Sequence, residues 1–371
     1  MTAASAAQPE IPRTVSPTPT VETADPLARP SCAPAAGVLA ALPLRDKLAQ
    51  LLMVGVTGAD DARNIVNTEH VGGIFVGSWT DLSMFNDGAL QQISTSSGPL
   101  PLSVSVDEEG GRVSRLSSLI GPSPSARELT AHRSVDEVYR LALDRGGQMR
   151  RLGISIDFAP VVDVTDAADD TVIGDRSFSA DPGTVITYAG AYARGLRDSG
   201  ILPVLKHFPG HGHASGDSHK VGVSTPPLAD LILADLVPYK SLLTERPVGV
   251  MIGHMQVPGL TGNEPASLSR AAIDLLRGGT GYGATPFVGP IFTDDLSSMR
   301  AITDRYGVPE AVLKALKAGA DTALWITTDQ VPAVLDRLQS AIAAGDLPIA
   351  SVEASLRRVA EAKAFSSGCA S

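Results

Sequence analysis

The stretch ILPVLKHFPGHGHASGDSHK, residues 201–220, carries the clearest signal for both the fold and the chemistry of this chain. Its first five residues are apolar and predict a buried strand. The residues that follow contain four of the chain's seven histidines, together with Lys206 and Asp217. Titratable side chains that crowd just past a buried strand are typical of a catalytic or binding site. An incidental surface loop is the alternative, but three glycines and Pro209 give this loop a special shape.

The same pattern of an apolar run and a helix repeats along the chain. Eight apolar runs lie at 50–56, 71–77, 101–107, 154–163, 201–208, 248–254, 288–295 and 321–327. Helical patterns lie at 44–49, 59–69, 81–95, 135–151, 183–198, 228–245, 270–277, 296–305, 308–318, 330–343 and 350–365. Continuous apolar strands indicate parallel strands that are buried on both faces. Eight such units predict an α/β fold, a single (β/α)₈ TIM-type barrel.

A doubly wound open sheet is the alternative fold. Such a sheet normally carries a glycine-rich nucleotide loop after its first strand. The corresponding segment, GVTGADDA (55–62), is a poor match to that loop. We therefore favour the barrel, over residues 41–371.

Residues 1–40 differ from the rest of the chain. The first 36 are rich in Pro, Ala, Thr and Ser and lack apolar periodicity, which predicts a disordered tail or linker. Cys32 and Cys369 flank the barrel. Because a barrel brings its first and last elements together, we expect a disulfide between them and an oxidising compartment. Two unrelated free thiols remain the alternative.

The bulk composition limits the partners. The net charge is −10 and no basic stripe is present, so nucleic acid is not expected. Aromatic residues make up 4% of the chain, which argues against a broad stacking platform for polymers. No run of eighteen apolar residues and no signal-peptide pattern occurs, so we expect contact with a membrane only through a removed N-terminal lipid anchor.

Polar side chains follow five of the predicted strands. They are Asp107, Asp163, the pair Lys206 and His207, His254, and the pair Asp294 and Asp295. The carboxyl ends of parallel strands all face one mouth of a barrel, where active sites are built. These residues are therefore expected to surround one site.

Two groups suit glycoside hydrolysis. Asp217 stands two residues before His219, and a carboxylate beside a histidine fixes its tautomer and supports a general acid/base role. Asp294 ends a strand at the mouth, as a carboxylate nucleophile would. A carboxylate nucleophile and a proton donor together are the equipment of retaining glycosidases. Arg115, Arg176 and Lys206 are candidate donors to a sugar, and Asp107 is a candidate acceptor of its hydroxyl groups.

Several residues also have structural interpretations. Asp295 is expected to cap the next helix, His211 to shape its loop rather than to act as a direct catalyst, and His213 to face solvent. Asp163 is expected to hold backbone or a lysine, with a contact to substrate as the alternative. His207 is either in the pocket or in the core, His254 is either pocket floor or core, and Glu108 with Glu109 is either surface charge or part of a tight turn at the mouth. A metal site from His211, His213, Asp217 and His219 would instead make a metal-dependent hydrolase. No second cluster completes its ligand set, so no metal is predicted. A non-catalytic sugar-binding lipoprotein is a third possibility.

The motifs resemble a known family. KHFPGHG (206–212), followed four residues later by DSH (217–219), resembles the bacterial β-N-acetylglucosaminidases of glycoside hydrolase family 3. Further blocks match in order: VDEEGGRVSRL (106–116), RLGISIDFAPVVDV (151–164), IGDRSF (173–178), EPASLS (264–269) and IFTDDLS (291–297). The tail and cysteines are similar to its actinobacterial, mycobacterial-type envelope-lipoprotein branch.

The resemblance implies specific roles. Asp294 is the nucleophile, and His219 is the acid/base oriented by Asp217. The pocket for terminal N-acetylglucosamine is lined by Asp107, Arg115, Arg176, Lys206 and His207. His213 departs from the family, which usually has an acidic residue there, and this places the dynamics of the loop in question rather than the reaction.

The implied substrates are peptidoglycan fragments that carry N-acetylglucosaminyl-β-1,4-N-acetylmuramic acid, in cell-wall turnover outside the cytoplasm. We expect no cofactor, and a single barrel suggests a monomer. A neutral histidine acid/base repels phosphate less than a carboxylate would, which leaves some phosphorolysis open beside hydrolysis.

Overall fold

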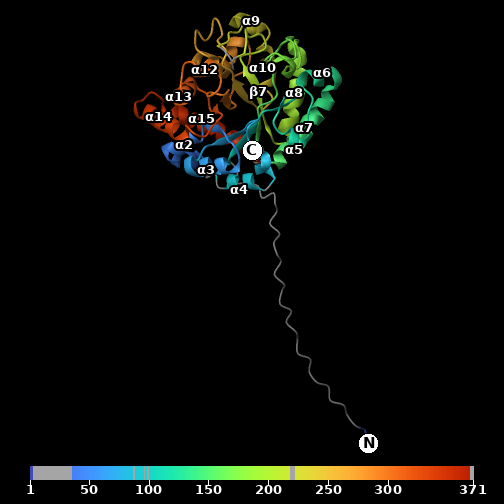
Figure 1. Cartoon of the computed structure of the whole chain (residues 1–371), viewed down its shortest axis with the longest axis vertical. Coiled ribbons are helices and arrows are strands. Elements are labelled where there is room, and N and C mark those ends of the chain that lie inside the picture. The colour runs from blue at the N-terminus through green and yellow to red at the C-terminus, as the bar shows by residue number, and fades with distance from the viewer. Residues whose placement is uncertain (3–35, 87, 96, 98–99, 218–221, 368–371) are drawn as a thin grey trace.

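A computed structural model shows a ring of parallel strands with helices arranged around it, from α2–α4 through α5–α8 to α13–α14 (Figure 1). The structure describes residues 1–2, 36–86, 88–95, 97, 100–217 and 222–367. The strands follow the order β10-β1-β2-β3-β6-β7-β8-β9. A bridge between Phe292 and Thr322 joins β9 to the start of β10 and closes the ring. The predicted TIM-type barrel is therefore confirmed.

Each strand of the barrel lies within an apolar run predicted from the sequence. The strands are β1 (Leu52–Gly55), β2 (Gly73–Val76), β3 (Ser103–Val106), β6 (Ile156–Asp157), β7 (Leu202–Phe208), β8 (Gly249–Ile252), β9 (Ile291–Thr293) and β10 (Ala323–Trp325). A short antiparallel hairpin, β4 (Glu108–Gly110) and β5 (Val113–Ser114), rises from the end of β3. The sequence predicted only a tight turn at this hairpin.

Helices connect the strands and cover the outside of the ring. The first set is α1 (Ala36–Ala41), α2 (Leu44–Ala49), α3 (Ala59–Glu69), η1 (Leu82–Phe85), α4 (Ala89–Thr95), α5 (Ser117–Ile120), α6 (Ala126–His132), α7 (Val135–Arg151), η2 (Gly174–Arg176) and α8 (Pro182–Asp198). The second set is α9 (Leu228–Leu233), α10 (Val237–Leu242), η3 (Ala266–Leu268), α11 (Arg270–Gly278), η4 (Thr280–Tyr282), α12 (Arg300–Thr303), α13 (Val308–Ala318), α14 (Val331–Ala343) and α15 (Ile349–Ser366). Among the described residues, no helix is long and apolar enough to cross a bilayer.

Local sequence signals explain where α7 and α8 begin and how they pack. Ser134 and Glu137 form a reciprocal capping box at the start of α7. Asp181 caps α8 with its side chain, and a proline follows at the first helical position. The two helices approach closely at Gly195, where a Cβ atom would lie 2.5 Å from the carbonyl oxygen of Tyr139. Glycine is therefore required at this crossing.

Four predicted elements differ from the structure. The helix predicted at 228–245 is two helices, because Pro238 has no N–H to donate and is accommodated in the first turn of α10 instead of in a helix interior. The helix predicted at 296–305 is only α12, because the Asp295 carboxylate first holds the chain in a turn. The segment 81–95 divides into η1 and α4, and the strand predicted at 154–163 is reduced to β6 and one bridge at Val161.

Apolar side chains fill the inside of the barrel. They are Met53, Phe75, Ile156, Phe158, Leu202, Val204, Met251, Phe292 and Leu324. Phe158 lies at the centre of an aromatic row, with ring centroids 5.9 Å from Phe75 and 5.5 Å from Phe292. The barrel is therefore a packed core whose chemistry is restricted to its ends.

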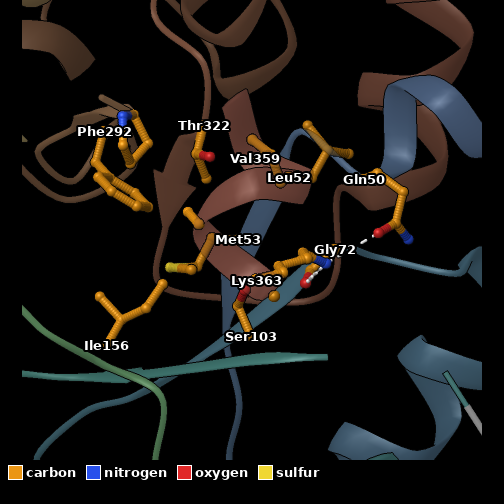
Figure 2. A pocket seen from close by; sticks show the side chains of 13 residues that line it. Gln50, Leu52, Met53, Gly72, Ser103, Ile156, Phe292, Thr322, Val359 and Lys363 are labelled. Carbon is orange, nitrogen blue, oxygen red and sulfur yellow. Dashed lines mark hydrogen bonds between the residues drawn. The ribbon is translucent and has the colours of Figure 1, made fainter. Parts of the chain in front are cut away.

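The last helix closes the bottom of the barrel, where the strands begin. Ala362 and Phe365 of α15 pack against the interior cluster. Lys363 is buried beside them and donates hydrogen bonds to Gln50 Oε1 at 2.9 Å and to the Gly72 carbonyl at 2.7 Å (Figure 2). Burial lowers the pKa of Lys363 to about 7. Among the described residues, no carboxylate lies within ion-pair distance of this amine.

We predict that Lys363 makes stability depend on pH in a particular direction. Its folded pKa lies below its ordinary value of 10.5, so the unfolded chain binds more protons between about pH 7 and pH 10. The free energy of unfolding of the wild type should therefore rise with pH relative to that of Lys363→Met, by at most about 1.4 kcal/mol per pH unit. Denaturant unfolding of both proteins across this range measures the difference. A constant difference would show that the amine is charged in the folded protein.

Candidate active site

The carboxyl ends of the strands bring the predicted site residues to one mouth of the barrel. Asp107 follows β3, Asp163 follows the bridge at Val161, Lys206 and His207 lie in β7, and Asp294 follows β9. These strands are neighbours around the same parallel ring, so their ends face the same side. Residues that are up to 187 positions apart are thus gathered at one end of the fold.

A buried network of four charges forms the floor of the mouth. Lys206 Nζ lies 2.6 Å from Asp107 Oδ1 and 2.5 Å from Glu109 Oε1. Arg176 donates two hydrogen bonds to Glu109, of 2.7 and 2.8 Å, in a bidentate pair. The Lys206 side chain is 2% exposed, whereas that of Asp107 is 21% exposed. Asp107 is therefore the carboxylate of this network that a ligand can reach.

Neighbouring charges favour the ionised forms of Glu109 and Lys206 by shifting the pKa of each. Burial opposes the charged form of Glu109, but Arg176 and Lys206 outweigh it and hold the pKa of this carboxyl well below its usual range. Burial alone would lower the pKa of Lys206, but Asp107 and Glu109 outweigh it and raise that pKa. The two cations and two anions therefore balance, and they present a fixed polar surface to the mouth.

A second carboxylate, Asp163, orients two histidines. His207 Nδ1 lies 2.6 Å from Asp163 Oδ2, and the backbone N–H of His211 donates to Asp163 Oδ1 at 2.7 Å. Burial would raise the pKa of Asp163, but His207 outweighs it and the pKa is lowered. The other ring nitrogen of His207 lies 3.5 Å from Arg176 Nη2. His207 thus adjoins the charge network, and Asp163 has the structural role expected of it.

The predicted nucleophile, Asp294, lies beside this histidine cluster. Its backbone N–H donates to the Ile252 carbonyl at 3.0 Å, and its Oδ1 accepts from the N–H of Asp295 at 2.9 Å. Burial, together with the charge of His207, lowers the pKa of His211, while Asp163 and Asp294 act in the opposite direction. The Asp294 carboxylate is only partly buried, as a group that meets substrate must be.

Asp295 and His254 face away from the mouth. The Asp295 carboxylate accepts from the backbone N–H groups of Ser297 at 2.8 Å and Ser298 at 3.1 Å. His254 is buried, with Nδ1 2.7 Å from Ser267 Oγ and Nε2 2.7 Å from the Asp295 carbonyl. Asp295 therefore caps a turn before α12 rather than the helix itself, and His254 belongs to the core.

The loop after β7 carries the predicted acid/base pair. Asp217 is half-buried and lines a hollow of about 530 Å³ together with His211, Arg112 and Ile173. His219 lies outside the described residues, so its pairing with Asp217 remains a prediction. The proposed disulfide partners Cys32 and Cys369 also lie outside them. Among the residues that the structure does describe, no three acidic, histidine or cysteine side chains are grouped as metal ligands.

His213, which departs from the family pattern, joins this loop to the body of the protein. Its Nδ1 lies 3.0 Å from Asp235 Oδ2, in the segment between α9 and α10. Burial raises the pKa of Asp235 to about 6, although His213 acts in the opposite direction. The His213 ring is largely exposed, as expected, but it also makes an ion-pair contact that the sequence did not predict.

Arg115 follows the β4–β5 hairpin, and one nitrogen of its guanidinium group makes no hydrogen bond to the described residues. Its Nε is buried and has no hydrogen-bond partner among the described residues. Buried polar atoms are rarely left without a partner, so an orphaned guanidinium nitrogen beside a candidate site points to a ligand. This observation is consistent with the predicted contact between Arg115 and a sugar.

The residue that sequence reasoning missed is Glu109. The pair Glu108 and Glu109 was compatible with surface charge, but both side chains are buried. Glu108 forms an ion pair with Arg145 and accepts from Ser114 Oγ at 2.6 Å, which fixes the hairpin. Buried Lys206 and Arg176 need compensating anions, and Asp107 alone supplies too few. The excess of two expected pocket cations, Lys206 and Arg176, over one expected anion, Asp107, is the signal in the sequence that could have identified Glu109.

Comparison with known proteins identifies relatives over nearly the whole barrel. The model of the glycosyl hydrolase family 3 N-terminal domain matches residues 43–362. The beta-hexosaminidase LpqI of Mycobacterium tuberculosis is 68% identical over 340 residues, which are 91% of this chain and 87% of that protein.

Two solved structures extend the comparison. A family 3 glycosyl hydrolase from Mycobacterium smegmatis superposes with a TM-score of 0.87 at 68% identity, over 87% of this chain and 98% of that one. A family 3 β-N-acetylglucosaminidase from Paenibacillus gives a TM-score of 0.80 at 33% identity, over 89% of this chain and 64% of that one.

We predict that Glu109→Gln destabilises the protein by about 3 kcal/mol, because it leaves two buried cations with one carboxylate. The lowered pKa of Glu109 means that this loss is fully present above its ordinary value of 4.5 and shrinks as the pH falls below it. Urea unfolding at pH 7 and pH 3.5 measures both effects. Asp60→Asn, at a carboxylate that is 99% exposed, is the control and should cost less than about 1 kcal/mol. Equal losses in the two variants would contradict the network's role.

Proposed function

The chain belongs to glycosyl hydrolase family 3 and is a β-hexosaminidase, and from this premise we propose that it removes terminal β-linked N-acetylglucosamine with retention of configuration. One observation carries the proposal. A partly buried carboxylate, Asp294, ends β9 beside the histidine cluster, while the buried network of Asp107, Glu109, Arg176 and Lys206 forms the adjoining floor. This arrangement offers a nucleophile next to a fixed set of groups for sugar hydroxyls.

The proposed reaction has two halves. In the first, an Asp294 oxygen attacks the anomeric carbon, the bond to the leaving oxygen breaks, and His219 gives that oxygen a proton. In the second, His219 takes a proton from water, the water attacks the same carbon, and Asp294 is released. Two inversions at one carbon give net retention.

The floor of the mouth suits recognition of the sugar without taking part in proton transfer. Asp107 is positioned to accept hydrogen bonds from sugar hydroxyl groups, and its contact with Lys206 Nζ at 2.6 Å holds its carboxylate in place. Arg176 and Lys206 are held by Glu109, so they present fixed donors rather than mobile ones. The Nε of Arg115, which has no hydrogen-bond partner in the part of the chain that the structure describes, adds a donor that is suited to an oxygen of the substrate.

The natural substrate that we propose is a peptidoglycan fragment with N-acetylglucosamine β-1,4-linked to N-acetylmuramic acid. The proposal rests on the motif resemblance and on the high identity to a mycobacterial beta-hexosaminidase. Location in the cell envelope and a monomeric state are part of the same proposal. Fractionation of cells and sedimentation of the purified protein would test these two points.

Substitution of the two catalytic residues should separate their roles. With an aryl β-N-acetylglucosaminide, Asp294→Ala should lose at least about 10³-fold in kcat/KM, because the nucleophile is absent. His219→Ala should lose about 10²–10⁴-fold on poor leaving groups and much less on good ones. Asp304→Ala, at an exposed aspartate that directly follows α12, is the matched control and should keep full activity. Full activity of Asp294→Ala would refute the assigned nucleophile.

The stereochemical outcome is a separate test. We predict that the N-acetylglucosamine released from the disaccharide with N-acetylmuramic acid appears first as the β-anomer. Proton NMR during the first minutes of turnover distinguishes the anomers before they equilibrate. The α-anomer as first product would indicate a single displacement by water. No release from this disaccharide, with release from other β-N-acetylglucosaminides, would exclude only the peptidoglycan substrate.

A further inference from the structure

Two backbone hydrogen bonds fasten the loop after β7 before it reaches Asp217. The N–H of His211 donates to the buried carboxylate of Asp163 at 2.7 Å. The N–H of Ser215 donates to the Ser224 carbonyl at 2.8 Å, which joins the outgoing arm of the loop to its returning arm. Asp217 stands two residues beyond Ser215 and lines the hollow of about 530 Å³ together with His211. The position of Asp217 therefore depends on how the short segment from His211 to Ser215 is held.

Between these two bonds, one side-chain contact joins the segment to another part of the barrel. His213 Nδ1 lies 3.0 Å from Oδ2 and 3.1 Å from Oδ1 of Asp235, in the turn between α9 and α10. The Asp235 side chain is 2% exposed, whereas that of His213 is 41% exposed. A Cβ atom on Gly210 would lie 2.4 Å from the Cβ atom of Asp235, so the loop backbone also packs against this aspartate. Asp235 is thus a buried anchor, and His213 is the side chain that attaches the loop to it.

Asp235 has one cationic partner. Among the described residues, His213 is the only cationic side chain within ion-pair distance of its carboxylate. The other titratable groups that face Asp235 are Asp163, after β6, and Tyr239 of α10, and neither can carry a positive charge. Burial raises the pKa of Asp235 to about 6, although His213 acts in the opposite direction. The contact is therefore charge-assisted above about pH 6 and weaker below it, where the carboxyl is protonated.

We propose that the pair of His213 and Asp235 is a positioning device, which holds the loop where Asp217 can orient the acid/base. The inference rests on the proposed function, in which Asp217 has that role. Neither His213 nor Asp235 is among the described residues that line the hollow, so the pair acts through the loop backbone and not through contact with substrate. Proton transfer requires hydrogen-bond distance, and a displacement of about 1 Å is enough to impair it. Loss of the pair should therefore weaken proton donation while every reacting group stays in the chain.

Proton donation is tested by the dependence of activity on the leaving group. We compare the phenyl β-glycoside of N-acetylglucosamine, whose leaving oxygen needs a proton, with the dinitrophenyl β-glycoside, whose leaving group departs as a stable anion. For His213→Ala we expect kcat/KM to fall about 10-fold on the phenyl glycoside and to stay within about 2-fold on the dinitrophenyl glycoside. His213→Asn, which keeps an N–H donor near the place of Nδ1, should retain most of the activity on both.

A second histidine–aspartate pair supplies the matched control. His70 Nδ1 lies 3.0 Å from Asp46 Oδ1 near the strand starts, at the opposite end of the barrel. Asp46→Ala removes this pair and should leave the activity on both glycosides unchanged. Equal losses of His213→Ala on the two glycosides would mean that its pair only supports the folded structure, and no loss on either would mean that the loop does not need it. Each of these two results overturns the inference.

A double-mutant cycle tests whether the effect passes through Asp217. In the Asp217→Ala background, His213→Ala should cause less than about 2-fold further loss on the phenyl glycoside, because the group that it positions is already absent. A further loss as large as that in the wild-type background would contradict a route through Asp217.

Asp235→Asn separates positioning from stability, because asparagine is the permanently uncharged counterpart of this aspartate. The folded protein binds more protons than the unfolded chain between the ordinary pKa of 3.8 and the raised pKa of about 6, so the wild type loses stability relative to Asp235→Asn as the pH rises through this window. Above it, the variant should be at least as stable in urea as the wild type, yet lose at least about 3-fold in kcat/KM on the phenyl glycoside. This loss should shrink below about pH 6, where the wild type is also uncharged at Asp235. A loss that is the same at every pH, or that follows a loss of stability, contradicts the inference.

Hydrogen exchange tests the hold on the loop without turnover. The N–H groups of His211, Ala214 and Ser215 are all donors in hydrogen bonds of this segment. In His213→Ala, amide exchange over residues 210–217 should become at least about fivefold faster, and in Asp46→Ala it should not change. Unchanged exchange in His213→Ala overturns the inference. If the wild type cleaves neither glycoside but exchange over 210–217 still rises in His213→Ala, the proposed function fails and the hold of the pair on the loop stands.

Discussion

The ion pair that joins Lys206 to the carboxylates of Asp107 and Glu109 is the interaction on which the rest of the site depends. Lys206 extends from β7 into the mouth, where its amine is almost fully removed from water. Desolvation of an ammonium group costs several kcal/mol, so the amine stays charged there only if anions are placed against it. One of these anions follows β3 directly, and the other comes from the hairpin that rises beside it.

This requirement explains several features around the mouth. The β4–β5 hairpin turns back so that Glu109 can reach Lys206, and buried Glu108 fixes the hairpin through Arg145 and Ser114. Glu109 in turn needs a second cation, which Arg176 supplies from η2. Arg176 then reaches His207, whose other ring nitrogen is held by Asp163. Ion pairs and hydrogen bonds thus fix the positions of Glu109, Arg176 and His207 relative to one another, although these residues come from distant segments of the chain.

The bottom of the barrel contributes to stability, whereas the top carries the groups suited to chemistry. At the bottom, α15 seals the strand starts, and a buried amine meets only neutral acceptors. In the middle, the row of Phe75, Phe158 and Phe292 fills the interior and separates the ends. At the top, the charges of Lys206, Arg176, Asp107 and Glu109 are concentrated in one network.

The sequence predicted the barrel and the location of most of its site residues, because continuous apolar runs are a strong signal and five of the eight runs have polar residues at their carboxyl ends. It failed where one side chain changed the backbone, as Pro238 divides a helix and Asp295 forms a turn before α12. It also missed the burial of Glu109, because burial depends on cations from segments far away in the chain.

The most direct test of the account is to look for a sugar bonded to Asp294. In His219→Ala, an aryl β-N-acetylglucosaminide with a good leaving group should still react with Asp294, but the attack by water should be slow because its base is missing. Mass spectrometry of the digested protein should then find one N-acetylglucosaminyl unit on the peptide that contains Asp294. An adduct on another residue, or rapid turnover without any adduct and with the α-anomer as first product, would contradict the assignment of Asp294 as the nucleophile.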